Sequence, residues 1–474
     1  MAFRAACDRC ESVGGPTSVV YRRGGKTATK LSELADRATR IDERGLAALV
    51  VGWPANRVSQ TLYRDVDVEL VTPAPRDGVE PRPTRREAPA FLRQALERCV
   101  DVALAGVKRA AVLTGGGMDS AVLLGLATDW AKRTGGSAFA VSLDFEGPGD
   151  DRPHLAALQR HLGCEVLRVT PEEAAPRMAL LASGVDAAPV ASSTMPMEVE
   201  MLVRAREHGA ERVLAGAGGD ELFGGVPSSL AEMATRGRPL DAMRMARRLQ
   251  GFHRPHSPAW TWVLRPLLGR WLPPGLRAWR GRRHAQLPEL SWAGPVVRSY
   301  LRERRRLAGE VNRRPPRTAP ERLRASWDET HQVVVASGRQ AEERASGMDC
   351  WYPYLDRDLM TTVTSLDPEL LLLGDRWRGL LRESARDLLP ESLRERMDKA
   401  HFEPAMRRWM EAAGGLERLR PLASGRELAA LGLVESKAFL AAFESFVADP
   451  SDPHFWVSLW SALAVEAFLR GRAS

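Results

Sequence analysis

Residues 113–120, Leu-Thr-Gly-Gly-Gly-Met-Asp-Ser, join a short apolar run at 110–113 to a helix-compatible apolar segment at 121–130. A glycine-rich turn between a strand and a helix leaves backbone N–H groups unpaired, and these groups can bind an anion. Three successive glycines let the backbone approach that anion without obstruction from Cβ atoms. The stretch therefore predicts a phosphate-binding turn. It is not a Walker A loop, because no Lys-Ser/Thr pair follows the glycines.

A second glycine-rich turn, LAGAGGDELFGG at 214–225, repeats the order of strand, glycines and acid. Asp119 in the first turn and Asp220 in the second each place a carboxylate beside the glycines. Two such acids at one edge of a sheet could hold one Mg²⁺ that bridges the phosphates of a nucleotide. From spacing alone the alternative stays open: two ordinary glycine turns whose acids are solvated or cap helices.

The chain around these turns alternates between short apolar strands and helices of about ten residues. Strands are expected at 110–113, 138–143, 165–169 and 212–214, and helices at 91–107, from 121 to the glycines at 135–136, at 153–162 and at 196–208. Repeated strand–helix–strand units predict an α/β fold with a parallel sheet and helices on both faces. Ligands of such sheets bind beyond the carboxyl ends of the strands, where both turns fall.

The two flanking regions have different patterns. Residues 1–88 are expected to form a small, β-rich N-terminal domain with strands at 18–21, 46–51 and 66–71, and a Pro- and Arg-rich linker at 73–89 leads to a second domain, 89–474. From 227 onward the chain is predicted to be almost wholly helical, and 454–470 to be an amphipathic helix.

Composition restricts the possible partners. The chain of 474 residues carries a net charge of +8 with six lysines, which leaves 62 of its 68 basic residues as arginine. The arginines are dispersed and not interleaved with stacking aromatics, which disfavours nucleic acid. No apolar run approaches the length of a membrane span, so no membrane insertion is expected. Five cysteines, among them a single C-x-x-C at Cys7 and Cys10, form no even framework and indicate a reducing cytoplasm.

Four stretches resemble motifs of known enzymes. Residues 115–120 resemble the S-G-G-x-D-S pyrophosphate loop of the N-type ATP pyrophosphatases, and 215–225 resemble the S-G-x-G-x-D-E-L-F-G-G stretch of the asparagine synthetase family. WYPYLD at 351–356 is similar to that family's R-x-P-F-L-D, and RMDKAHF at 396–402 to its R-x-x-K-x-x-F. With the Trp-containing C-terminal helix, the matches follow the family's order over about residues 95–470. The resemblance implies an adenine nucleotide α-hydrolase-like synthetase domain.

The resemblance also implies a reaction and its residues. Family members adenylate a carboxylate with ATP, release pyrophosphate and let an amine attack the acyl-adenylate, so ATP and Mg²⁺ are the implied cofactors. Asp119 and Asp220 match the Mg²⁺-binding acids. Lys399 matches a lysine that stabilises charge during amide formation in related cyclising enzymes, and it is the single lysine between Lys132 and Lys437. The matched ATP-binding positions are Leu113, Gly115, Gly116, Gly117, Met118, Asp119, Ser120, Val141, Ala215 and Gly216.

The chain also departs from the family. Asparagine synthetases begin with a glutaminase domain whose nucleophilic cysteine follows the initiator Met, but here Ala2 stands there and the region has about half the usual length. Ala217 replaces a glutamate that belongs to the ammonia-using reaction. Gly115 replaces a serine, for which Thr114 is a candidate substitute, and Arg378 replaces a common lysine. These departures predict an amide synthetase without glutaminase activity, whose amine is not ammonia.

Among relatives of that kind, the chain is most similar to lasso-peptide macrolactam synthetases, with β-lactam synthetases as the alternative. The Arg-rich helical segment 227–344 and the basic charge suit a peptide substrate that carries a carboxylate. The expected partners are a precursor (core) peptide and, with it, a leader-binding protein and a leader peptidase. Two more distant alternatives remain: a tRNA-modifying enzyme with the same pyrophosphate loop, and a non-catalytic scaffold.

Overall fold

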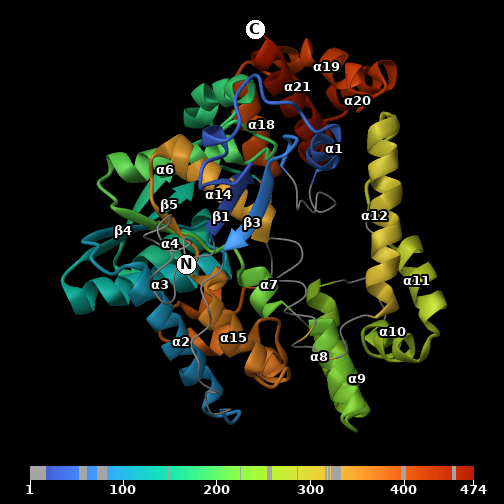
Figure 1. Ribbon diagram of the computed structural model, residues 1–474. Helices are drawn as coiled ribbons and strands as arrows, with labels where there is room; N and C mark the ends of the chain where they lie inside the picture. Colours follow the sequence, from blue (N-terminus) through green and yellow to red (C-terminus); the bar gives the residue numbers. More distant parts are fainter. Residues whose placement is uncertain are drawn as a thin grey trace.

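A five-stranded parallel sheet forms the centre of the molecule in the computed structural model (Figure 1). The structure describes residues 18–52, 61–71, 83–147, 150–224, 226–253, 259–285, 287–314, 318, 321, 332–396, 402–450 and 455–473. The strand order is β6-β5-β4-β7-β8, and every neighbouring pair is parallel. The strands are β4 (Arg109–Leu113), β5 (Ser137–Leu143), β6 (Glu165–Val169), β7 (Arg212–Leu214) and β8 (Cys350–Trp351).

The crossover helices show where the order of the strands in the sheet reverses. Helices α3 (Met118–Thr134) and α4 (Arg152–Leu162) lead outward from β4 to β5 and from β5 to β6, whereas α6 (Met195–Glu207) leads back to β7 on the other side of β4. Because such crossovers are right-handed, α3 and α4 cover one face and α6 the other. The carboxyl ends of β4 and β7 therefore flank the switch point, where α/β sheets bind ligands.

The predicted parallel α/β fold is confirmed, with the four expected strands in place. The fifth strand, β8, was not predicted, since two residues are too short to show a periodic pattern. Three further helices cover the α3 side: α2 (Ala88–Ala103), α15 (Arg357–Ser365) and α16 (Gly379–Ser384).

The N-terminal region contains a three-stranded antiparallel sheet of order β2-β1-β3, made of β1 (Ser18–Arg23), β2 (Lys26–Ala28) and β3 (Asp67–Val71). The strand expected at 46–51 is wrong, because these residues belong to helix α1 (Glu43–Val51). A short apolar run fits either element by pattern alone. The residues at the two ends of this segment favour a helix. The Asp42 side chain accepts hydrogen bonds from the backbone N–H groups of Arg44 and Gly45, and Gly52 ends the helix at a φ of 75°.

The core of this N-terminal region is continuous with that of the C-terminal helices. Leu46 and Val50 of α1 belong to the same buried cluster as Phe439 and Trp460. In Figure 1, α1 lies beside α19–α21 at the top of the molecule. The helices concerned are α18 (Glu403–Ala412), α19 (Arg426–Ala430), α20 (Ser436–Ala448) and α21 (Trp460–Ala473). Helix α21 is buried on every side from Trp460 to Leu469, so the expected amphipathic helix is wrong. Helix α1 of the N-terminal region and α19 are among the elements that pack against it.

Between β7 and β8 the described part of the chain is mostly helical, as predicted. It forms α7 (Gly219–Phe223), α8 (Val226–Thr235), α9 (Pro239–His253), α10 (Ala259–Trp271), α11 (Pro274–Arg283), α12 (Pro295–Arg313) and α14 (Gln332–Ser346). Helices α8–α10 share a small core of their own, and α11 packs along α12. In the part of the chain that the structure describes, none of the helices combines the length and apolar character needed to cross a bilayer.

Asp356, which precedes α15, is a half-buried acid with a structural role. Its carboxylate accepts from the backbone N–H of Leu359 at 2.9 Å and caps the helix. Burial raises the pKa of Asp356 to about 6. Folding therefore favours the protonated form of this group, and its contribution to stability is present below about pH 4 and is lost as the pH rises through 6.

Asp356→Asn should remove this pH dependence, because asparagine keeps a cap acceptor and cannot ionise. Relative to wild type, the variant should gain about 3 kcal/mol in free energy of unfolding between pH 4 and pH 7, from a shift of about two pKa units. Urea titrations at the two pH values measure the difference, and Asp42→Asn at the N-cap of α1 is the control for loss of a charged cap. An equal effect of Asp356→Asn at both pH values would contradict the assignment.

Candidate nucleotide and metal site

The two glycine-rich turns meet at the switch point of the sheet. They follow adjacent strands, since Val112 of β4 is in register with Leu214 of β7. A Cβ atom added to Gly219 would lie 2.6 Å from Cγ of Asp119, and one added to Gly216 would lie 3.2 Å from the backbone nitrogen of Ser120. The second glycine-rich turn thus packs directly against the N-terminal end of α3. Any larger residue at position 219 would collide with Asp119 and separate the two.

The first turn presents backbone N–H groups at the start of α3. Gly117 is the N-cap residue and provides no side-chain cap, and Gly116 has a φ of 82°, a conformation that favours glycine. The Thr114 hydroxyl lies 3.0 Å from that of Ser120, which donates to the carbonyl of Gly117. Thr114 is thereby engaged within the loop. The uncapped start of a 17-residue helix is a suitable place for a phosphate group.

A buried ion pair between Arg396 and Asp151 supports this loop. Nη1 of Arg396 lies 2.6 Å from Oδ1 of Asp151 and donates to the carbonyl of Gly116 at 3.1 Å. A Cβ atom at Gly115 would lie 2.9 Å from Oδ2 of Asp151. Glycine at 115, where the family has serine, therefore accommodates Asp151. Sequence reasoning missed Asp151, whose place before the Arg-Pro start of α4 indicated only a helix end.

The two predicted metal-binding acids share one arginine. Nη1 of Arg378 donates to both carboxylate oxygens of Asp119, at 2.9 and 2.8 Å, and its Nη2 forms an ion pair with Asp220. The Arg378 side chain is 7% exposed, that of Asp119 14% and that of Asp220 46%. The guanidinium thus occupies the position between the two carboxylates. Sequence reasoning had noted Arg378 only as a cation that replaces a lysine.

These acids fit a magnesium ion. Mg²⁺ is commonly held by one or two carboxylates together with substrate phosphates, without a complete protein cage. The described residues contain no cluster of three or more His, Cys, Asp or Glu side chains arranged around a metal position. The Asp119–Asp220 pair at the edge of the phosphate turn, already associated with a cation, matches the simpler arrangement.

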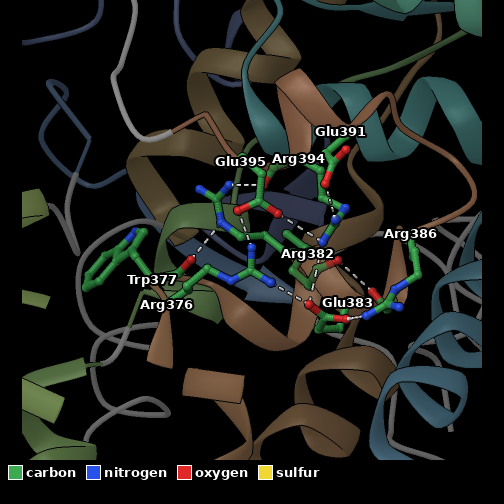
Figure 2. Close-up of polar contacts among 10 residues, drawn as sticks. Arg376, Trp377, Arg382, Glu383, Arg386, Glu391, Arg394 and Glu395 are labelled. Atoms are coloured by element: carbon green, nitrogen blue, oxygen red, sulfur yellow. Dashed lines mark hydrogen bonds and ion pairs between the residues drawn. The ribbon is translucent and has the colours of Figure 1, made fainter. Parts of the chain in front are cut away.

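A network of arginines and glutamates fixes the backbone that carries Arg378 and Arg396 (Figure 2). Arg382 is buried and donates to the carbonyls of Trp377 and Arg396, each at 2.8 Å, and to the carbonyl of Arg394. Burial, with the nearby charges of Arg378 and other arginines, lowers the pKa of Arg382 to about 10, so it stays charged at neutral pH. One side chain thereby ties the two arginine-bearing segments together.

The remaining predicted positions line the same edge. Val141 of β5 accepts a hydrogen bond from the backbone of Thr114 at 2.9 Å, and the Ala215 nitrogen donates to the Trp351 carbonyl of β8. The structure thus brings the following predicted residues to the carboxyl ends of β4, β5 and β7: Leu113, Gly115, Gly116, Gly117, Met118, Asp119, Ser120, Val141, Ala215, Gly216 and Asp220.

Tyr354 belongs to the motif at 351–356, and the sequence predicted no role for it. Its hydroxyl donates to the Asp119 backbone carbonyl at 2.9 Å, and its ring is completely buried against Phe223. Tyr354 therefore helps to fix the position of the first helical turn of α3.

Lys399 lies outside the described residues, as do Ala2 and the Cys7–Cys10 pair. The described residues on either side of the Lys399 segment both lie near the site. Arg396 contacts the phosphate turn, and the ring of Phe402 packs 6.3 Å from that of Phe145, just after β5. The role of Lys399 stays a prediction.

Arg378→Met should destabilise the protein by about 3 kcal/mol in the presence of a chelator, because the buried carboxylate of Asp119 loses its partner. Mg²⁺ should restore much of this loss, since a divalent cation can take the place of the guanidinium. Thermal unfolding with EDTA and with Mg²⁺ measures both effects. Arg133→Met, which removes a solvent-exposed ion pair with Asp101, is the matched control. Equal stabilisation of both variants and wild type by Mg²⁺ would contradict this arrangement.

Comparison with known proteins supports one family. A search of curated proteins found no match. Among solved structures, the chain is similar to the U34-tRNA thiolase NcsA from Methanococcus maripaludis with its [4Fe-4S] cluster, at 16% identity over 35% of this chain and 60% of that chain; a TM-score of 0.22 is too low to support an argument. The sequence model of asparagine synthase, in contrast, matches residues 91–470, which include both turns and all of the sheet. The chain therefore belongs to the asparagine synthase family.

Proposed function

We propose that the protein is an AMP-forming carbon–nitrogen ligase that closes the macrolactam ring of a lasso peptide. A carboxylate oxygen of an Asp or Glu side chain attacks the α-phosphorus of ATP, and the bond to the β-phosphate breaks with release of pyrophosphate. The N-terminal amine of the peptide then attacks the acyl carbon, loses a proton and expels AMP. Family membership supports ATP-dependent amide formation, and the remaining details belong to this proposal.

The observation that carries the nucleotide chemistry is the meeting of Asp119 and Asp220 beside the uncapped start of α3. In the proposed reaction, the N–H groups of residues 117–120 bind the phosphates that leave as pyrophosphate. Asp119 and Asp220 would hold Mg²⁺, which when bound would supply positive charge to the phosphates. Arg378 adds a fixed positive charge next to the leaving group.

The proposal that the amine belongs to the peptide rests on the residue that replaces a glutamate of the ammonia-using reaction. Ala217, in the second turn, supplies no carboxylate. The described N-terminal region also shares its core with α20 and α21, which supports a structural role for it. A tethered amine on the substrate itself would make an ammonia source unnecessary. On this proposal the substrate is a core peptide, delivered with the help of a leader-binding protein and a leader peptidase.

Incubation with ATP, Mg²⁺ and a linear core peptide should yield AMP and pyrophosphate in equal amounts, and a peptide that has lost one water. Mass spectrometry with fragmentation locates the new amide between the N-terminus and the acidic side chain. Release of ADP would exclude adenylation. Cyclisation of a small carboxyethyl amino acid in place of the peptide would instead support the β-lactam alternative.

Asp119→Ala and Asp220→Ala should each reduce turnover at least about a hundredfold, because the developing charge on the phosphates loses a metal ligand. Asp101→Ala, which removes an exposed carboxylate of α2 that pairs with Arg133, is the matched control and should leave turnover unchanged. Full activity of both site variants would show that these acids do not hold the metal.

A further inference from the structure

The positive charge of the protein is concentrated in helices α10–α12. Residues 259–314 contain thirteen arginines, no lysine and three glutamates, which gives this segment a net charge of +10. Because the whole chain carries +8, all other residues together have a net charge of −2. In Figure 1 these helices lie along the right-hand margin of the molecule, away from the central sheet. The net positive charge of the chain is thus a property of one peripheral part, which we call the α10–α12 arm.

The α10–α12 arm also exposes large apolar side chains in a regular pattern. Leu264, Leu268 and Trp271 recur at i, i+4 and i+7 on α10 and are 41%, 61% and 87% exposed. The opposite side of this helix is anchored, since Trp262 and Val263 are buried in the core shared with α8 and α9. Helix α10 is therefore apolar on two faces, of which only one is needed for folding.

Helix α11 also exposes large apolar side chains. Leu276 and Trp279 are 44% and 47% exposed, and the Arg283 guanidinium lies 5.3 Å from the centre of the Trp279 ring. The other side of α11 contacts α12 closely, because a Cβ atom at Gly281 would lie 2.7 Å from the Ala308 carbonyl oxygen. The packing against α12 thus turns Leu276, Trp279 and Arg283 outward.

The third helix contributes charge to the α10–α12 arm. Arg302 and Arg313 of α12 are exposed and lie on one face of the helix. Among the residues that the structure describes, no carboxylate forms an ion pair with Arg283, Arg302 or Arg313, although ion pairs engage many arginines elsewhere. These guanidinium groups are therefore available to an anionic partner.

We propose that the α10–α12 arm is a docking surface for an anionic lipid bilayer. Exposed Trp and Leu side chains bordered by arginines are typical of helices that lie in the membrane interface, where the apolar groups enter the acyl boundary and the cations meet lipid phosphates. The exposed apolar side chains belong to helices at the margin of the molecule (Figure 1). Peptides and other small ligands are instead bound in grooves and concave sites, which favours a broad lipid surface over a peptide as the occupant.

Flotation of the full-length protein with vesicles tests this surface. Wild type should partition onto phosphatidylcholine vesicles that contain phosphatidylglycerol and not onto pure phosphatidylcholine, and high salt should weaken the binding. Leu268→Ser with Trp271→Ser should reduce the partition coefficient tenfold or more, because two large apolar side chains no longer enter the acyl boundary. Arg283→Gln with Arg302→Gln should reduce it about fivefold per arginine.

Matched controls separate this surface from general apolar or basic character. Leu440→Ser changes a 40%-exposed leucine on α20, and Arg85→Gln with Arg86→Gln removes two exposed arginines near the start of α2. Both controls should bind vesicles like wild type, and all variants should keep the wild-type circular dichroism spectrum. Failure of wild type to bind anionic vesicles, or unchanged binding by the arm variants, would overturn the proposal. Binding of RNA or an acidic peptide to the α10–α12 arm without partition onto vesicles would also overturn it.

Discussion

The guanidinium of Arg378 between the carboxylates of Asp119 and Asp220 is the interaction on which the site depends. Two carboxylates at such close positions on adjacent turns repel each other unless a cation lies between them. The sheet brings the acids together because β4 and β7 are neighbours, and the glycines of the second turn allow it to contact α3. On the proposed function, the position that the guanidinium occupies would also suit a metal ion held together with substrate phosphates.

Holding a charged side chain at so buried a position requires support from several elements. Arg378 has a φ of 53°, an uncommon conformation for a residue with a Cβ atom, and its segment is tied down by the hydrogen bonds of Arg382. Removing charges from water is costly, and buried ion pairs often add little net stability. We infer that the surrounding arginines fix the position of the charge, and that the α/β core provides most of the stability.

The molecule separates these roles among its parts. The central sheet and its helices position the two glycine-rich turns at the carboxyl ends of β4 and β7. The N-terminal region and the C-terminal helices share one core, in which α1 packs with Phe439 and Trp460. The α10–α12 arm carries an excess of positive charge that none of these cores uses. Charge and apolar surface that folding does not require are the features from which a partner can be inferred.

The sequence alone determined the parallel sheet, the two turns and the acids at its edge, because glycine positions and hydrophobic periodicity are local properties. It misassigned 46–51, where capping by Asp42 and Gly52 outweighed a short apolar run, and it could not reveal that α21 is buried on every side. Asp151 and the bridging position of Arg378 also depended on the tertiary structure. Both residues act on groups more than thirty positions away in the chain, and only the folded sheet brings them together.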